Sequence, residues 1–275
     1  MQWNFYLSGI LYGKFYVKDN DIFVEKLDAA KGIWYPKETF TEESDDFFKK
    51  LCSRSLLDFF KNKKEYEEKI SEGADEFTAS SGETFSNRRN EVYFQRQKKF
   101  PKDLFYDEDG IYAVLMSGRD FAAVLVKNGE EDRTILSRWK KAFPEPPAAV
   151  NFLGTFFVDT RDGEKLATDV YLPKGEAYKE QKVPSVLIRT PYGKGERPEQ
   201  YYRFVQRGYA VVIQDTRGRE DSTGEWLPNY YEVEDGDDTL NWIADQKWSD
   251  GQVSMTGGPI WDMCSGRQRP AEILT

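Results

Sequence analysis

The sequence predicts an α/β fold for residues 152–256, preceded by a mixed α+β region. Two observations lead to this prediction. Short apolar runs of strand length alternate with helix-like stretches, and glycine or proline residues mark the ends of both. The resulting order of strand, helix, strand, helix and strand implies parallel strands that are joined by right-handed crossovers.

The elements of the α/β region follow one another closely. Residues 152–158 and 166–172 form a predicted antiparallel hairpin, which turns at Arg161-Asp162-Gly163 and stops at Pro173. Buried strands are then expected at 183–188 and 209–213, and helices at 197–206 and 232–245. A last short strand is expected at 253–255.

Residues 1–150 contain no motif that carries chemistry, so we interpret them as an accessory region of unknown role. Strand pairs are expected within 10–27 and over 111–126, the second pair turning at 117–120. The stretch 45–70 indicates an amphipathic helix, broken near Ser53. Residues 71–90 are small and polar and indicate a loop, and the proline-rich residues 143–147 suit a domain boundary.

Composition excludes several function classes. Lys+Arg number 39 and Asp+Glu 48, which gives a net charge of −9 and argues against nucleic-acid binding. No apolar run approaches the roughly 18 residues of a membrane span, and the first residues do not resemble a secretory signal, so a cytoplasmic location is the default expectation. Two cysteines do not make a disulfide framework. The chain has 0 histidines, which excludes a histidine base or histidine metal ligand within it.

Three segments follow predicted strands, where α/β sheets place their sites. In the segment 189–194, Tyr192 lies on a turn that Pro191 stiffens. Its phenol is either a hydrogen-bond donor to developing negative charge or part of a turn residue with a partly buried ring. The segment 214–219 mixes one carboxylate with two guanidinium groups, which favours a structural ion-pair network over a catalytic role. The segment 256–259 has the glycines of a nucleophile elbow but no hydroxyl group at the elbow position.

Several ordered motifs lie at characteristic spacing between Leu153 and Gly258. They are Val158-Asp159-Thr160-Arg161-Asp162-Gly163, Leu166-Ala167-Thr168-Asp169-Val170-Tyr171, Arg189-Thr190-Pro191-Tyr192-Gly193-Lys194, Gln214-Asp215-Thr216-Arg217-Gly218-Arg219 with Ser222, Gly224 and Glu225, Glu234-Asp235-Gly236-Asp237-Asp238, Trp242-Ile243 and Trp248-Ser249-Asp250-Gly251. This stretch resembles the amino-terminal half of the hydrolase domain of the X-Pro dipeptidyl-peptidase-like family (peptidase family S15). That family includes cocaine-esterase-type acyl hydrolases and α-amino-acid ester hydrolases.

The resemblance implies an α/β-hydrolase fold and a Ser-His-Asp mechanism, with no metal or organic cofactor. Tyr192 matches the family's oxyanion-hole tyrosine. The second oxyanion donor would be the backbone N–H of residue 260. The family's elbow has the pattern G-x-S-Y-x-G, whereas here Pro259 stands at the nucleophile position and Ile260 at the tyrosine position.

After Gly258 nothing matches the family, which suggests a frameshift or a mispredicted gene end. We therefore expect an accessory region over 1–150, a truncated α/β-hydrolase sheet over 151–258 and an aberrant tail over 259–275. In that tail Cys264 and Ser265 have no histidine to activate them, so we interpret them as unstructured. Ser222 is interpreted as a turn residue.

By resemblance, the function is serine hydrolysis of acyl bonds, with an X-Pro peptide or a small-molecule ester or amide as substrate. As this chain, the protein is expected to be inactive, because the nucleophilic serine and the catalytic Asp and His are missing. Two alternatives stay open: a catalytically dead peptide-binding module, and a truncated gene product without function. The sequence leaves the oligomeric state open.

Overall fold

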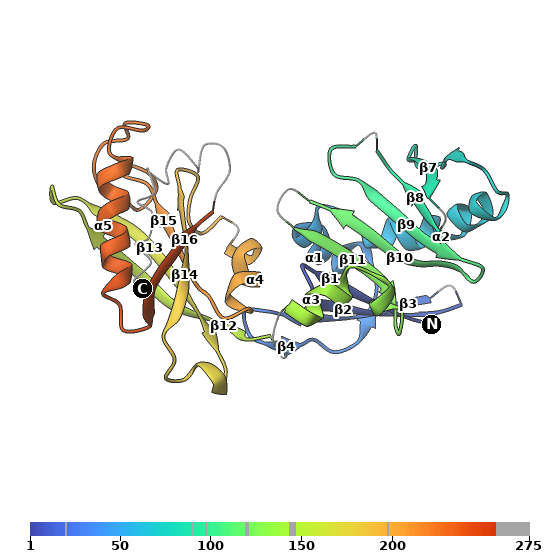
Figure 1. Ribbon diagram of the computed structural model, residues 1–275, viewed down its shortest axis with the longest axis horizontal. Helices are drawn as coiled ribbons and strands as arrows, with labels where there is room; N and C mark the ends of the chain where they lie inside the picture. Colours follow the sequence, from blue (N-terminus) through green and yellow to red (C-terminus); the bar gives the residue numbers. More distant parts are fainter. Residues whose placement is uncertain are drawn as a thin grey trace. The chain divides into compact units, whose positions relative to one another are not determined.

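The structure is a computed structural model that describes residues 1–19, 21–89, 91–96, 98–118, 121–142, 147–196 and 198–256. The chain divides into two compact units. The first consists of Met1–Asp28 and Ile33–Glu145, and the second of Ala29–Gly32 and Pro146–Thr275 (Figure 1).

The first unit is built on an antiparallel sheet, which has 11 strands in the described part of the chain. Its spatial order is β4-β3-β2-β1-β11-β10-β9-β8-β7-β6, with β5 paired to β3. The bounds are β1 Gln2–Leu7, β2 Ile10–Lys18, β3 Asp21–Asp28, β4 Ile33–Trp34, β5 Glu38–Thr39, β6 Glu76–Thr78, β7 Thr84–Arg89, β8 Val92–Phe94, β9 Lys102–Asp107, β10 Gly110–Ser117 and β11 Ala122–Lys127.

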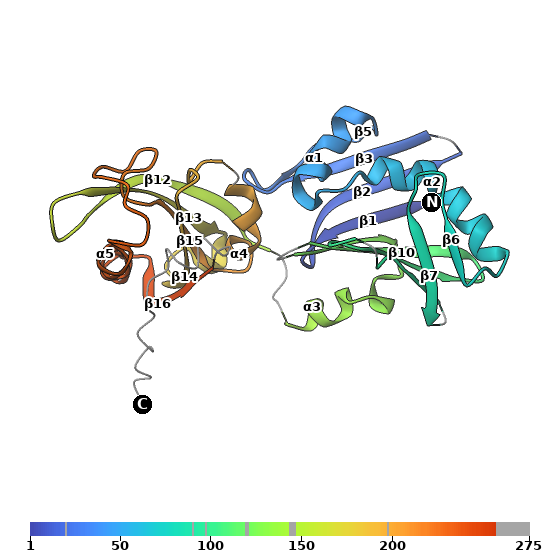
Figure 2. The same ribbon diagram turned by 90° about the horizontal axis from the view of Figure 1, so that it is seen from above.

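Helices cover both faces of this sheet (Figure 2). Helices α1 (Glu42–Cys52) and α2 (Leu56–Ser71) lie on one face, where an aromatic core fixes them: Phe48 of α1 packs edge-on against Phe5 of β1. The other face carries the short helix η1 (Glu131–Arg133) and α3 (Leu136–Ala142), with Leu136 buried against strand residues.

The predicted helix break near Ser53 is confirmed, because Ser53 ends α1 in the left-handed region at φ 55° and Ser55 caps α2. The predicted loop over 71–90 is wrong, since this stretch contains β6 and β7. Small polar residues form these strands because Phe77 and Phe85 alternate with them, stack on each other and anchor the pair in the core.

The second unit is an α/β structure with a sheet of five described strands. Their bounds are β12 Ala149–Asp159, β13 Lys165–Lys174, β14 Val183–Thr190, β15 Ala210–Asp215 and β16 Ser249–Met255, and their order is β12-β13-β15-β14-β16. β12, β13 and β15 pair antiparallel, whereas β14 pairs parallel with both β15 and β16. The predicted hairpin and the predicted parallel pairing of the two central strands are therefore confirmed.

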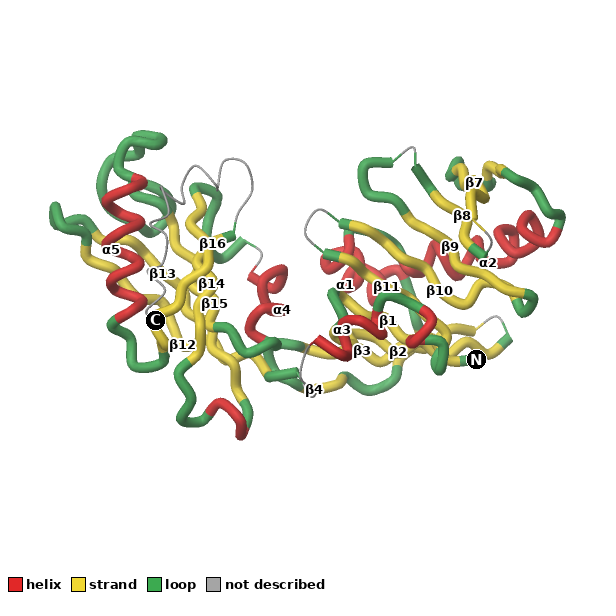
Figure 3. The backbone as a smooth tube through the Cα atoms, viewed as in Figure 1, coloured by secondary structure: helices red, strands yellow, loops and turns green. Residues whose placement is uncertain are grey.

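Helices on opposite faces connect these parallel strands, as Figure 3 shows. The helices η2 (Glu176–Tyr178), η3 (Pro198–Tyr201) and α4 (Tyr202–Val205) are short, and Tyr201 and Val205 pack on one face against Ile188 and Ile213. Helix α5 (Glu232–Ala244) covers the other face through Ile243. The chain leaves β14 for β15 on one side and later reaches β16 on the other. The reversal lies at the carboxyl end of β14, which is the position where α/β proteins bind ligands.

Candidate functional site

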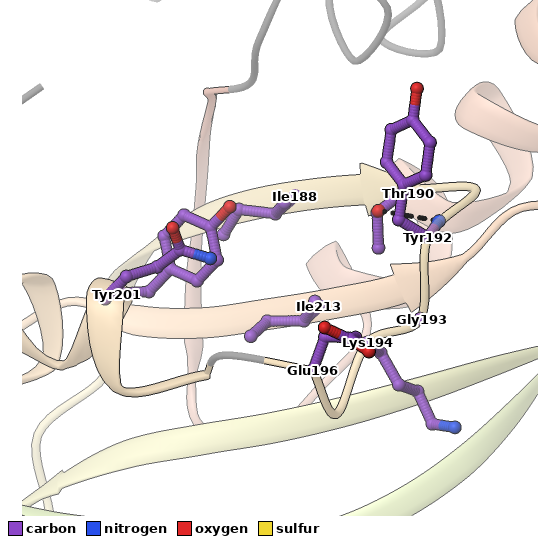
Figure 4. A pocket seen from close by; sticks show the side chains of 9 residues that line it. Ile188, Thr190, Tyr192, Gly193, Lys194, Glu196, Tyr201 and Ile213 are labelled. Atoms are coloured by element: carbon purple, nitrogen blue, oxygen red, sulfur yellow. Dashed lines mark hydrogen bonds between the residues drawn. The ribbon is translucent and has the colours of Figure 1, made fainter. Parts of the chain in front are cut away.

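The loop that follows β14 carries Tyr192 at the carboxyl edge of the sheet. Its side chain is 51 % exposed, although Thr190 and Pro191 before it are buried. The Tyr192 backbone N–H donates a hydrogen bond to Thr190 Oγ1 at 3.1 Å. Figure 4 shows the ring standing out from the loop, with the hydroxyl group at its far end and the Lys194 side chain pointing the other way. The structure therefore places the Tyr192 phenol on an exposed part of the loop that follows β14.

A buried ion pair holds the far end of this loop. The Lys194 ammonium donates to Asp215 Oδ2 at 3.0 Å and to Asp221 Oδ2 at 2.5 Å. Burial lowers the pKa of Lys194, but hydrogen bonds to Asp221 and Asp215 outweigh it, so the net shift is upward. Lys194 is therefore a charged structural cation.

A pocket of about 300 Å³ lies beside Tyr192, on the sheet face that α4 covers. Its apolar part is formed by Ile188, Ile213 and Tyr201, and polar residues complete it (Figure 4). The full lining is Ile188, Thr190, Tyr192, Gly193, Lys194, Glu196, Gln200, Tyr201 and Ile213. The pocket has room for a small organic group next to the phenol.

The arginines at the strand ends form a structural network, as predicted for 214–219. Arg217 donates to both oxygens of Asp235, at 2.5 and 3.1 Å, and to both oxygens of Asp162, at 2.9 and 2.6 Å. Hydrogen bonds from Arg217 hold the pKa of Asp162 well below its usual range. Arg189 is fully buried and forms an ion pair with Glu232 at 2.8 Å. This network ties the start of α5 to the strand ends.

Ser222 has the structural role that the sequence predicted, with different partners. Its hydroxyl donates to the Asp215 carbonyl at 2.8 Å and accepts from the Ala167 N–H at 2.9 Å. The serine is buried and bridges two strands instead of bonding only within its own turn. It is not placed to act as a nucleophile.

Sequence reasoning missed one carboxylate near Lys194. Asp169 lies in β13 and is 7 % exposed, and burial raises its pKa although Thr155 Oγ1 donates to it at 2.7 Å. A carboxylate inside an otherwise apolar strand is the signal that could have singled it out. Among the described residues, no cluster of His, Cys, Asp or Glu could hold a metal ion.

The expected elbow region lies outside the described residues. This applies to Gly257 and Gly258, to Pro259 and Ile260, and to Cys264 and Ser265 of the tail.

Comparison with known proteins bears on the second unit. Residues 162–259 match the model of the X-Pro dipeptidyl-peptidase (S15) family. Over these residues the chain is similar to the S15 hydrolase family. It resembles the cocaine esterase of Rhodococcus sp. (strain MB1 Bresler), with 43 % identity over 106 residues, 36 % of this chain and 18 % of that protein. It also resembles the putative serine esterase Mb1866c of Mycobacterium bovis (strain ATCC BAA-935 / AF2122/97), with 33 % identity over 125 residues, 37 % of this chain and 19 % of that protein.

Solved structures match part of this chain. An α-amino acid ester hydrolase is 28 % identical with a TM-score of 0.35, over 39 % of this chain and 21 % of that one. The aminopeptidase of a marine-sediment Thaumarchaeota archaeon is 26 % identical with a TM-score of 0.38, over 42 % and 22 %. The chain thus spans about a fifth of the length of the relatives it matches. No helix in the described ranges is both long and apolar enough to cross a membrane.

Proposed function

We propose that the second unit supplies the oxyanion side of an S15-type site for acyl-bond hydrolysis, with Tyr192 as a hydrogen-bond donor. The supporting observation is a half-exposed phenol on a loop with an anchored backbone, at the carboxyl end of β14 and beside a pocket. A phenol there can stabilise the negative charge that forms on a carbonyl oxygen when a nucleophile attacks. The substrate is a small ester or an X-Pro peptide.

The chain of 275 residues does not complete this reaction by itself. It has no histidine to act as the base of a Ser-His-Asp triad, and Pro259 stands where the family has its serine. We therefore expect no hydrolysis of proline anilides or aryl esters above background.

A matched pair of proteins tests both statements. The first is the 275-residue chain. The second is a hybrid in which Gly258 is followed by the family's Ser-Tyr-x-Gly elbow and the remaining hydrolase domain of the Rhodococcus cocaine esterase. The hybrid should hydrolyse an aryl ester, and Tyr192→Phe should lower its kcat by about 10²–10³-fold, the usual loss for one oxyanion donor. Tyr230→Phe is the control, because Tyr230 is 71 % exposed in the same unit.

Equal activity in both proteins, blocked by a serine-directed reagent, would show that another residue is the nucleophile. An unchanged kcat in the Tyr192→Phe hybrid would reduce Tyr192 to a turn residue.

The pocket favours a second candidate, a catalytically dead module that still binds a peptide. Titration of the chain with an X-Pro dipeptide amide, followed by NMR, separates the candidates. Chemical-shift changes confined to residues around Ile188 and Tyr201 support the binding module. If millimolar peptide causes no chemical-shift change, the binding module is refuted, and the alternative of a truncated product without function is favoured.

A further inference from the structure

We propose that Asp215 and Arg219 form a clamp that positions Tyr192 by holding the backbone on both sides of it. Both residues come from the end of β15 and the turn that follows it, whereas Tyr192 follows β14. The positioning role rests on the proposed function of Tyr192, but the clamp can be measured without it.

Asp215 holds the chain after Tyr192. Its Oδ1 accepts the Lys194 backbone N–H at 2.6 Å, and its Oδ2 accepts the ammonium group of the same residue at 3.0 Å. Asp215 is fully buried and Lys194 is 8 % exposed. One carboxylate therefore fixes both the main chain and the side chain two residues beyond the phenol, through charge-assisted bonds that water does not reach.

Arg219 holds the chain before Tyr192. Its Nε donates to the Pro191 carbonyl at 2.9 Å, and its guanidinium lies 5.7 Å from the centre of the Trp226 ring. Gly218 allows the backbone of Trp226 to pack close to the turn. It adopts φ 67°, and a Cβ atom there would lie 2.3 Å from the Trp226 backbone nitrogen. The turn is thus shaped so that Arg219 reaches back to the loop after β14.

The two contacts explain how an exposed ring can be held in place. Tyr192 is 51 % exposed, so packing around the ring cannot supply all of its orientation. The clamp fixes the main chain at Pro191 and Lys194 instead, and the Cα–Cβ direction of Tyr192 follows from that main chain. Oxyanion stabilisation requires such a donor to be in place before charge develops.

Hydrogen exchange of the full chain, followed by mass spectrometry over peptides that cover 188–196, tests the clamp. Arg219→Met should speed exchange of the Tyr192 and Lys194 amides about tenfold, the effect of losing one hydrogen bond to a charged group. Arg219→Lys keeps a cation that can reach the Pro191 carbonyl and should restore most of the protection. The control is Lys165→Met, which removes an exposed ion pair with Asp159 in the same unit.

Asp215→Asn tests the contact on the other side of Tyr192. Labelling with 3-fluorotyrosine and ¹⁹F NMR follow the tyrosine ring directly. The Tyr192 signal is assigned by its loss in Tyr192→Phe. Both clamp variants should shift or broaden this signal, and Lys165→Met should not. If Asp215→Asn does not fold, the Arg219 pair alone decides. Unchanged exchange in Arg219→Met, or equal acceleration across β14 and β15, overturns the clamp.

The catalytic consequence is measured in the hybrid. Arg219→Met should lower kcat with little change in KM, and it should cost nothing further once Tyr192 is Phe. Faster exchange combined with no effect of Tyr192→Phe on kcat would keep the clamp and refute the oxyanion role. An unchanged kcat in Arg219→Met, while Tyr192→Phe is impaired, would refute the positioning role.

Discussion

Removing the Arg217 side chain should be among the most damaging single changes in the second unit. Arg217 is buried and binds Asp235, whose side chain is 1 % exposed. Arg217→Met leaves that carboxylate in the interior, with Arg189 at 3.7 Å as its remaining cation. Breaking a buried ion pair by removing one partner costs about 3–5 kcal/mol of unfolding free energy. For a unit of this size, that lowers Tm by roughly 10–15 °C.

The same arginine provides its own control. Asp162 is 46 % exposed, and Arg217 binds it with two hydrogen bonds much like those to Asp235. Asp162→Asn keeps the shape and removes an ion pair that water already screens, so the expected loss is much smaller than that of Arg217→Met. We therefore expect burial of the acidic partner, and not the number of hydrogen bonds to it, to decide how much unfolding free energy is lost.

Urea unfolding followed by tryptophan fluorescence measures both variants, with Trp242 and Trp248 reporting the second unit. A double variant, Arg217→Met with Asp235→Leu, should recover much of the loss, because Arg189 keeps its ion pair with Glu232 and the carboxylate that still loses Arg217, Asp162, is half-exposed. If Arg217→Met costs no more than Asp162→Asn, or if the double variant is no better than the single one, the network does not stabilise the unit in this way.

Two further predictions concern titratable groups. Cys52 is buried, and burial raises the pKa of its thiol to about 12. In a Cys264→Ser chain, a thiol reagent at pH 8 should therefore label Cys52 only after urea is added. Labelling at the rate of a free thiol would contradict the packing of α1. Burial alone would raise the pKa of Asp238, but hydrogen bonds from the Arg161 side chain and backbone, together with its charge, bring the pKa below its usual value. A carboxylate with a lowered folded-state pKa stabilises the fold above its unfolded pKa of about 4 and loses this contribution as the pH falls towards the folded value. Arg161→Met should therefore flatten the fall in the urea midpoint as the pH drops below about 4, and an unchanged pH profile would refute this assignment.

The sequence predicts the elements of the second unit well where burial is uniform. The central strands are continuous apolar runs, because both faces of β14 and β15 are covered, and α5 begins with the acidic residues that helix starts favour. The helix expected over 197–206 is instead a 3₁₀ turn followed by a single α-turn. Its pattern was too short to fix a helix type, since Tyr201 and Val205 are the residues that anchor it.

The polar network was predictable in kind but not in its partners. Alternating Asp and Arg over 214–219 indicated ion pairs, yet Arg217 binds Asp162, 55 residues earlier, and Asp235, 18 residues later. Local sequence holds no information on such distances. The strand carboxylate Asp169 was missed for a related reason, because its surroundings come from strands that are distant in the chain.

The pairing register of β14 and β15 determines which residues contact the loop that carries Tyr192. Tyr192 can be located from sequence because it directly follows a strand. The partners of its loop depend on the parallel pairing that places Thr190 opposite Asp215. A slip of one residue in that pairing would turn Asp215 to the other face of the sheet and take its carboxylate away from the Lys194 N–H. The apolar residues of β14 and β15 would move to the wrong faces at the same time, so packing of the core on both faces selects the register. The loop that carries Tyr192 is therefore held in place by the same burial that makes the two strands recognisable, although no residue near it in the sequence indicates that Lys194 will bind Asp215.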